Sequence, residues 1–148
     1  KVNFPNNDNV RHNVFSPSKV KSFNLGMYGV GETKSIIFDK PGVIAVLCNV
    51  HAEMSTYILA LKNPYFAVTD KEGNFSIPLS KAMKEAKVFE QYSDIPAGKY
   101  IIRTWHEKLK PVTQEVIVPE KGEVQVNLNL TRGKSDEELY PEGKVTKK

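Results

Sequence analysis

Hydrophobic and polar residues alternate in short runs along most of the chain, which is the pattern expected of half-buried β-strands. Clusters rich in glycine, proline and asparagine, such as Asp39-Lys40-Pro41-Gly42, separate the runs and predict turns. The pattern therefore predicts an all-β protein, with consecutive strands of its first part joined in a β-meander. In that first part the expected strands cover residues 1–4, 10–15, 23–28, 33–38, 43–48 and 55–61.

A second set of alternating runs follows residue 62 and predicts a second, smaller β unit. The turn Asp70-Lys71-Glu72-Gly73 is expected to close a hairpin. Ala82, Ala86 and Phe89 recur at helical spacing, so one short inserted helix is expected within residues 80–91. The expected strands of this part cover residues 65–69, 74–77, 101–105, 112–118 and 123–130.

These runs divide the chain into two β domains and a tail. The domains are expected at residues 1–62 and 63–131, and the tail at residues 132–148. The tail is polar and charged without periodicity, which is typical of a flexible end or of a partner-binding extension.

Composition and charge argue against several classes of function. The net charge of +4 in 148 residues is modest, and the basic residues are scattered along the chain, so nucleic-acid binding is not indicated. No apolar run approaches the ~18 residues of a membrane-spanning helix, so no membrane span is expected. The single cysteine excludes an internal disulfide.

The segment Cys48-Asn49-Val50-His51-Ala52-Glu53-Met54 carries a thiolate, an imidazole and a thioether within seven residues. His12 offers a second imidazole. Two His, one Cys and a weak axial Met suit copper, because soft sulfur holds Cu(I) and imidazole suits both oxidation states. A structural zinc site normally uses four strong nitrogen or sulfur ligands, and a thioether is a poor choice for it. The alternative interpretation is a buried free cysteine near a core methionine and a surface histidine.

Two stretches, Phe4-Pro5-Asn6 through His12-Asn13-Val14-Phe15 and Gly42 to Tyr57, resemble the copper-binding half of a cupredoxin, and the short loop is most similar to that of amicyanin. In that family a His-Asn pair on an early strand and a Cys-x2-His-x2-Met loop bind one copper ion. The resemblance implies that Asn13 links the two ligand loops near the sulfur. It implies as ligands His12, Cys48, His51 and Met54.

The resemblance also implies a redox partner protein and a location in the periplasm or outside the cell. Electrons would pass through the edge of His51, with Val50 and Ala52 as the apolar docking patch. Cupredoxins have one or two further strands ahead of the first strand here. The resemblance thus implies a Greek-key sandwich that lacks its first strand or strands. Either an N-terminal stretch is missing from this sequence, or another chain donates a strand or assembles at the open edge.

The second domain resembles a different family. A Gly-x-Phe strand followed by Ile95-Pro96-Ala97-Gly98-Lys99-Tyr100 is similar to the carboxypeptidase regulatory-like β-sandwich of transthyretin type. Such modules generally have structural or interaction roles. The tandem arrangement resembles plastocyanin-like proteins often labelled methylamine-utilisation proteins.

No enzyme is expected, because the best-placed histidines belong to the metal set and four ligands leave no open position for a substrate. The expected function is that of a type 1 (blue) copper protein that carries single electrons. The alternatives are a copper storage or delivery protein and a structural subunit of an exported assembly. His106 is open to two interpretations, a role with Trp105 in metal binding or electron transfer and an ordinary histidine at a strand end. Met27 is also open to two, a position near the metal and a place in the core or at its rim.

Overall fold

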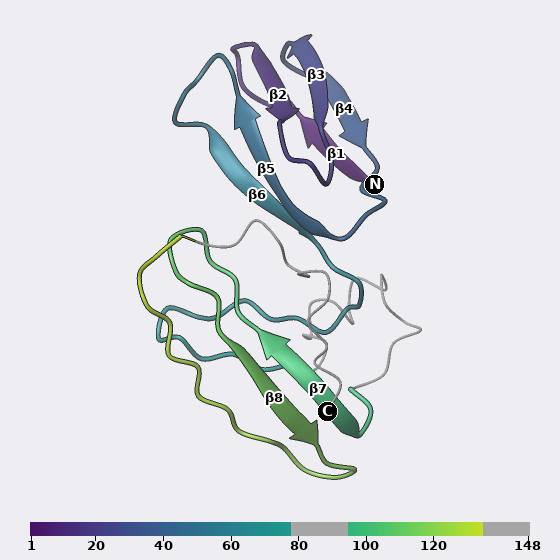
Figure 1. The fold of residues 1–148 in the computed structure, drawn as a ribbon. Helices are drawn as coiled ribbons and strands as arrows, with labels where there is room; N and C mark the ends of the chain where they lie inside the picture. The colour runs from purple at the N-terminus through teal and green to yellow at the C-terminus, as the bar shows by residue number, and fades with distance from the viewer. Residues whose placement is uncertain (78–94, 135–148) are drawn as a thin grey trace. The chain divides into compact units, whose positions relative to one another are not determined.

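The computed structural model describes residues 1–77 and 95–134. These residues form two compact units, with the boundary between Lys62 and Asn63 (Figure 1). The described residues contain eight β-strands and no helix, so the all-β prediction is confirmed. The helix predicted within residues 80–91 and nearly all of the predicted tail lie outside the described residues.

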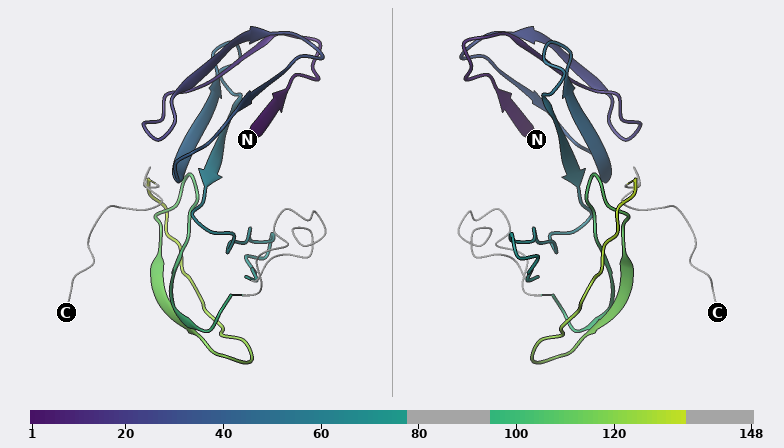
Figure 2. Two further views of the ribbon diagram at one scale, coloured as in Figure 1. Left: turned by 90° about the vertical axis from the view of Figure 1, so that its right-hand side faces the viewer. Right: turned by 90° about the vertical axis from the view of Figure 1, so that its left-hand side faces the viewer.

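The first unit holds six strands in two sheets (Figures 1 and 2). Four strands form an antiparallel sheet in the order β3-β2-β5-β6, and the other two pair as β1-β4. Each strand falls on one of the predicted runs. Their bounds are β1 Val2–Pro5, β2 His12–Ser16, β3 Phe23–Tyr28, β4 Thr33–Ile36, β5 Gly42–Cys48 and β6 Ser55–Ala60.

The prediction of a β-meander is wrong for this unit. β2 pairs with β3 on one side and with β5 on the other, and β1 pairs with β4, from Val2↔Ile36 to Pro5↔Thr33. Two of the pairings therefore join strands that are distant in the sequence. Alternation indicates that a segment is a strand but contains no information on which strand it pairs with.

The core of the first unit lies on β2, β3 and β5. Val14, Tyr28, Ile44 and Val46 form its buried cluster, and Ile44 is fully buried at the centre of β5. Side chains from both sheets pack against this cluster, and β1 contributes the ring of Phe4. The partly buried residues around the cluster are Phe4, Val20, Phe23, Leu25, Phe38, Ile58 and Ala60.

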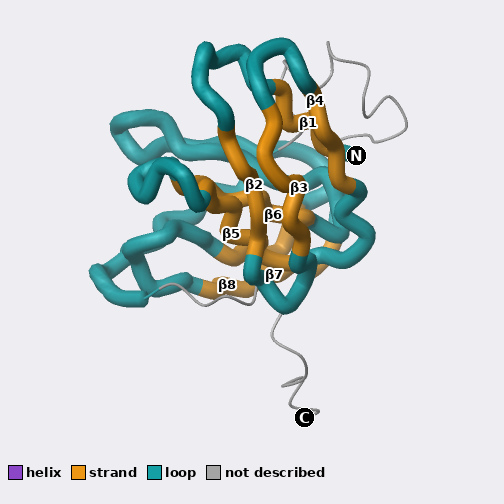
Figure 3. The backbone as a smooth tube through the Cα atoms, turned by 90° about the horizontal axis from the view of Figure 1, so that it is seen from above, coloured by secondary structure: helices purple, strands orange, loops and turns teal. Residues whose placement is uncertain are grey.

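The second unit is described by a smaller sheet. β7 (Gly98–Arg103) and β8 (Thr113–Val118) pair antiparallel, and an isolated bridge joins Leu109 to Arg132. The long connections around this sheet are drawn as loops in Figure 3. Within the described ranges, no helix has the length and apolar character needed to cross a membrane.

Three strands predicted for the second unit are not strands. The turn at Asp70 is present, since Asp70 N donates to Asn74 O at 2.9 Å and Gly73 N donates to Asp70 O at 3.1 Å. The flanking segments nevertheless lack a strand ladder in the described part of the chain. Alternating residues become a strand only where a neighbour supplies that ladder. The strands that this excludes are 65–69, 74–77 and 123–130.

Candidate metal centre

His12 and Cys48 meet because β2 and β5 are antiparallel neighbours. His12 is the first residue of β2, and Cys48 is the last residue of β5. The register pairs Val14 with Cys48, and Asn49 N donates to Asn13 O at 3.4 Å just beyond the strand end. Both side chains are buried, and the Nδ1 atom of His12 lies 3.9 Å from the Sγ atom of Cys48.

His51 reaches the same point from the loop between β5 and β6. Met54 N donates to His51 O, and Cys48 N donates to Met54 O, both at 3.1 Å, so the loop closes tightly on itself. The Nδ1 atom of His51 then lies 3.8 Å from Cys48 Sγ. The imidazole rings of His12 and His51 are 4.9 Å apart between centroids and tilted by 54°.

These three residues lie close enough to bind a metal ion. One donor atom from each of His12, Cys48 and His51 falls within 4.8 Å of the others. The group combines two buried side chains with the half-buried His51. The partial exposure leaves one imidazole near the surface.

The surroundings of Cys48 favour its thiolate. Burial raises the pKa of the thiol, but the backbone N–H of Asn13, the side chain of His12 and the backbone N–H groups of Val50 and His51 lower it, and the net pKa is about 6. The usual value for a cysteine is well above this. The thiolate is the form that binds metals, so above this pKa the side chain of Cys48 is in its metal-binding form.

Asp8 is a residue of the site that the sequence does not predict. Its Oδ2 atom lies 2.8 Å from the Nε2 atom of His12, the ring nitrogen on the side away from Cys48. The pKa of His12 is raised by its hydrogen bonds with Cys48 and Asp8, against the effect of burial. The only signal in the sequence is a carboxylate four residues before a histidine, and in a polar turn this spacing does not predict contact.

Asn13 joins the two ligand segments through its main chain. Its backbone oxygen accepts from Asn49, and its backbone N–H points to the sulfur. Its side chain turns to the other neighbour, because Nδ2 donates to Asn24 Oδ1 at 2.6 Å. Asn24 Oδ1 also accepts from Gly26 N at 2.8 Å, beside the irregularity in the β2–β3 pairing. The extra residue of this irregularity lies on β3 between Asn24 and Met27, so this hydrogen bonding braces β3 beside the strand of His12.

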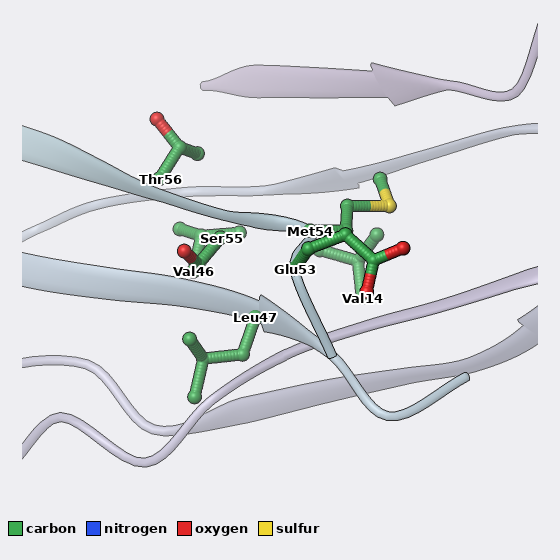
Figure 4. A pocket seen from close by; sticks show the side chains of 7 residues that line it. All are labelled: Val14, Val46, Leu47, Glu53, Met54, Ser55 and Thr56. Carbon is green, nitrogen blue, oxygen red and sulfur yellow. The ribbon is translucent and has the colours of Figure 1, made fainter. Parts of the chain in front are cut away.

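Met54 lines a hollow beside the ligand strands. The hollow has a volume of about 190 Å³ and is mostly apolar (Figure 4). Val14 and Val46 lie on its walls, and Val14 is the strand partner of Cys48. The side chain of Met54 is itself partly exposed. The lining residues are Val14, Val46, Leu47, Glu53, Met54, Ser55 and Thr56.

The other candidate residues are more exposed. Val50 and Ala52 are exposed on either side of His51 in the sequence. Met27 is an exposed residue opposite Asn13 on β3. His106 belongs to the second unit, where it is exposed and its Nδ1 atom accepts from Lys108 N at 3.0 Å.

Comparisons of the chain with protein-family models, curated proteins and solved structures give no match. The resemblance of residues 1–62 to cupredoxins, and that of the second unit to regulatory-like sandwiches, therefore stay predictions from the residues. The proximity of His12, Cys48 and His51 does not depend on either resemblance.

Proposed function

We propose that residues 1–62 hold one copper ion in a type 1 site and that the protein carries single electrons between redox partners. The observation that carries the proposal is the arrangement of His12 and His51 around the sulfur of Cys48. The two nitrogen–sulfur distances, 3.9 and 3.8 Å, are nearly equal.

Those distances suit an imidazole nitrogen and a thiolate sulfur that bind the same cation. Metal bonds of about 2.0 Å to imidazole and 2.3 Å to thiolate put the two donor atoms about 3.7 Å apart at the 120° angle of a trigonal site, and about 3.5 Å apart at a tetrahedral angle. Both observed distances are slightly longer than either value, so each nitrogen lies close enough to the sulfur to share one cation with it. A trigonal His2Cys set with a long axial contact is the arrangement associated with blue copper.

The residues around the donors suit electron transfer. Copper held by this set would alternate between Cu(I) and Cu(II), one electron at a time. His12 and Cys48 are held at the ends of paired strands, so their positions change little when a charge is added or removed. Three backbone N–H groups, from Asn13, Val50 and His51, stabilise the negative charge on the sulfur of Cys48.

The proposal includes a weak axial ligand and a docking surface. Met54 is the axial donor, since it ends the loop whose backbone is bonded to Cys48. Val50 and Ala52 form the apolar surface around the half-buried His51, through which electrons would pass to a partner protein. A site with four donors has no position for a substrate, so we propose no catalysis. The expected location is the periplasm or the outside of the cell.

A second function, copper storage or delivery, is favoured by the exposure of Met54 beside an open hollow. Because the thioether is exposed, a competing ligand of an acceptor protein has access to the bound Cu(I) and can displace Met54. The two functions differ in how firmly copper is held and in whether it cycles reversibly.

The experiment is to load the full chain with one equivalent of Cu(II) and to measure two quantities. An electron carrier gives a reversible one-electron voltammogram and releases copper to an external chelator over hours. A delivery protein transfers its copper to the chelator within minutes. Cys48→Ser is the control for copper bound elsewhere, and a voltammogram unchanged in this variant would rule out the proposed site.

A further inference from the structure

The loop before β2 places a carboxylate against one of the three donors. We propose that Asp8 is a positioning residue for His12, which holds the imidazole with Nδ1 toward Cys48 and with its proton on Nε2. The inference rests on the proposed metal site at His12, Cys48 and His51, but it does not require that the metal be copper.

The contact has the geometry of a strong hydrogen bond. Asp8 Oδ2 is 2.8 Å from His12 Nε2, and the other ring nitrogen faces the sulfur at 3.9 Å. An acceptor on one imidazole nitrogen keeps the proton there, so the lone pair of the other nitrogen is free for a cation. Carboxylates in this position orient metal-binding histidines and increase their basicity.

A buried asparagine fixes the position of Asp8. Asn6 Oδ1 accepts from Asp8 N at 2.9 Å, while Asn6 Nδ2 donates to Val10 O at 2.9 Å and to Tyr28 O at 3.1 Å. Tyr28 is the strand partner of His12 on β3. The turn that carries Asp8 is thus bonded directly to the strand beside the histidine.

The main chain of Asn6 adds a second anchor. Asn6 N donates to Glu32 O at 2.9 Å, and Gly31 N donates to Asn6 O at 2.8 Å. The side chain of Asp8 is 66% exposed, yet three hydrogen bonds of Asn6, with Tyr28, Gly31 and Glu32, tie its turn to the rest of the unit. The carboxylate is therefore placed before a metal binds.

The second imidazole lacks this support. Within the described residues, the ring of His51 has one side-chain hydrogen-bond partner, Cys48 on Nδ1, and no carboxylate pairs with its other nitrogen. His12 is buried and braced, whereas His51 is half exposed. We therefore assign to Asp8 the role of holding His12, the buried imidazole of the site, in a fixed position.

The test measures the affinity of the full chain for Zn(II), a metal with no redox chemistry, in Asp8→Ala and Asp8→Asn. The matched control is Asp39→Ala, since Asp39 is another exposed carboxylate of the same unit and pairs with Lys21 at 2.7 Å. Long-range proton–nitrogen NMR of the Zn(II)-loaded proteins identifies which nitrogen of His12 carries the proton. Both readouts are taken on proteins whose backbone spectra match that of the wild type.

We expect Asp8→Ala to weaken Zn(II) binding about 10- to 100-fold, and Asp8→Asn to weaken it less because an amide oxygen still accepts. The Nε2–H of His12 should be observed in the wild type and exchange rapidly in Asp8→Ala. Asp39→Ala should match the wild type. Affinity in Asp8→Ala within about twofold of the wild type, or an equal loss in Asp39→Ala, would overturn the assignment.

The readout separates this inference from the proposed function. Zn(II) binding that depends on Asp8, in a protein that gives no thiolate–copper spectrum, would overturn the copper function and support the positioning role. A normal copper spectrum with Zn(II) affinity independent of Asp8 would do the reverse.

Discussion

Cys48 lies opposite Val14 where β5 pairs antiparallel with β2. Because His12 is two residues before Val14, the side chains of His12, Val14 and Cys48 lie on one face of the sheet. A slip of one residue in this register would turn Cys48 to the opposite face and separate it from the histidine. The metal centre therefore depends on strand pairing as much as on the ligand loop.

The first prediction concerns the ionisation of Cys48. Backbone N–H groups and His12 stabilise its thiolate, and the pKa is lowered to about 6. In the metal-free protein the ultraviolet absorbance of the thiolate should thus rise with a midpoint near pH 6, and the thiol should form only below it. Cys48→Ser should remove the step. A midpoint above pH 8, as in a free cysteine, would contradict the described surroundings.

The second prediction concerns the core. Ile44 is 0% exposed at the centre of β5, so Ile44→Ala should lower the free energy of unfolding by about 2–5 kcal/mol. Ile37→Ala is the matched control, because Ile37 is 63% exposed, and its effect should stay within about 0.5 kcal/mol. Urea unfolding of the metal-free chain measures both values. Equal losses would contradict the described core.

The strands of the first unit could be predicted from sequence because alternation and turn residues act locally. Their partners could not be predicted. β1 pairs with β4 although β2 and β3 lie between them in the sequence, and β2 pairs with β5 rather than with β1. In the second unit, the alternation of residues 123–130 predicts a strand that the structure does not contain, for the same reason. A ladder requires a neighbour that the local pattern does not specify.

The donors differ in how far the sequence could define them. Cys48 and His51 are three residues apart in the sequence, so their spacing alone indicates a site. His12 is the second imidazole that the set requires, but its position far along the chain gives no sign of contact, and the sheet register brings it to Cys48. Asp8 was missed because its contact with His12 depends on a turn held by Asn6, and those bonds leave no periodic signal.

The third prediction concerns the axial position. Met54 and Met27 are similarly exposed, at 41% and 47%, which makes Met27→Leu a matched control for Met54→Leu. Loss of a weak donor to Cu(II) should raise the reduction potential of the copper protein in Met54→Leu and shift its visible spectrum. Met27→Leu should change neither. Identical potentials in the two variants would show that Met54 is not a ligand.

The fourth prediction concerns docking. Ala52→Glu places a charge beside His51 in the proposed apolar patch, so electron exchange between oxidised and reduced copies should slow while the copper spectrum stays intact. NMR line broadening in mixtures of the two forms measures the exchange rate. Ala67→Glu adds the same charge at an exposed alanine of the second unit and serves as the control. Exchange unchanged by Ala52→Glu would place the electron path elsewhere.

The thiolate–copper bond is tested most directly by the visible and paramagnetic-resonance spectrum after addition of one equivalent of Cu(II), with Cys48→Ser measured in parallel. We expect an intense thiolate-to-copper charge-transfer band that is absent from the variant, since the sulfur lies 3.9 Å from Nδ1 of His12 and 3.8 Å from Nδ1 of His51. A faint, tetragonal copper signal that is the same in both proteins would contradict the proposed site, because the metal would then bind without the thiolate.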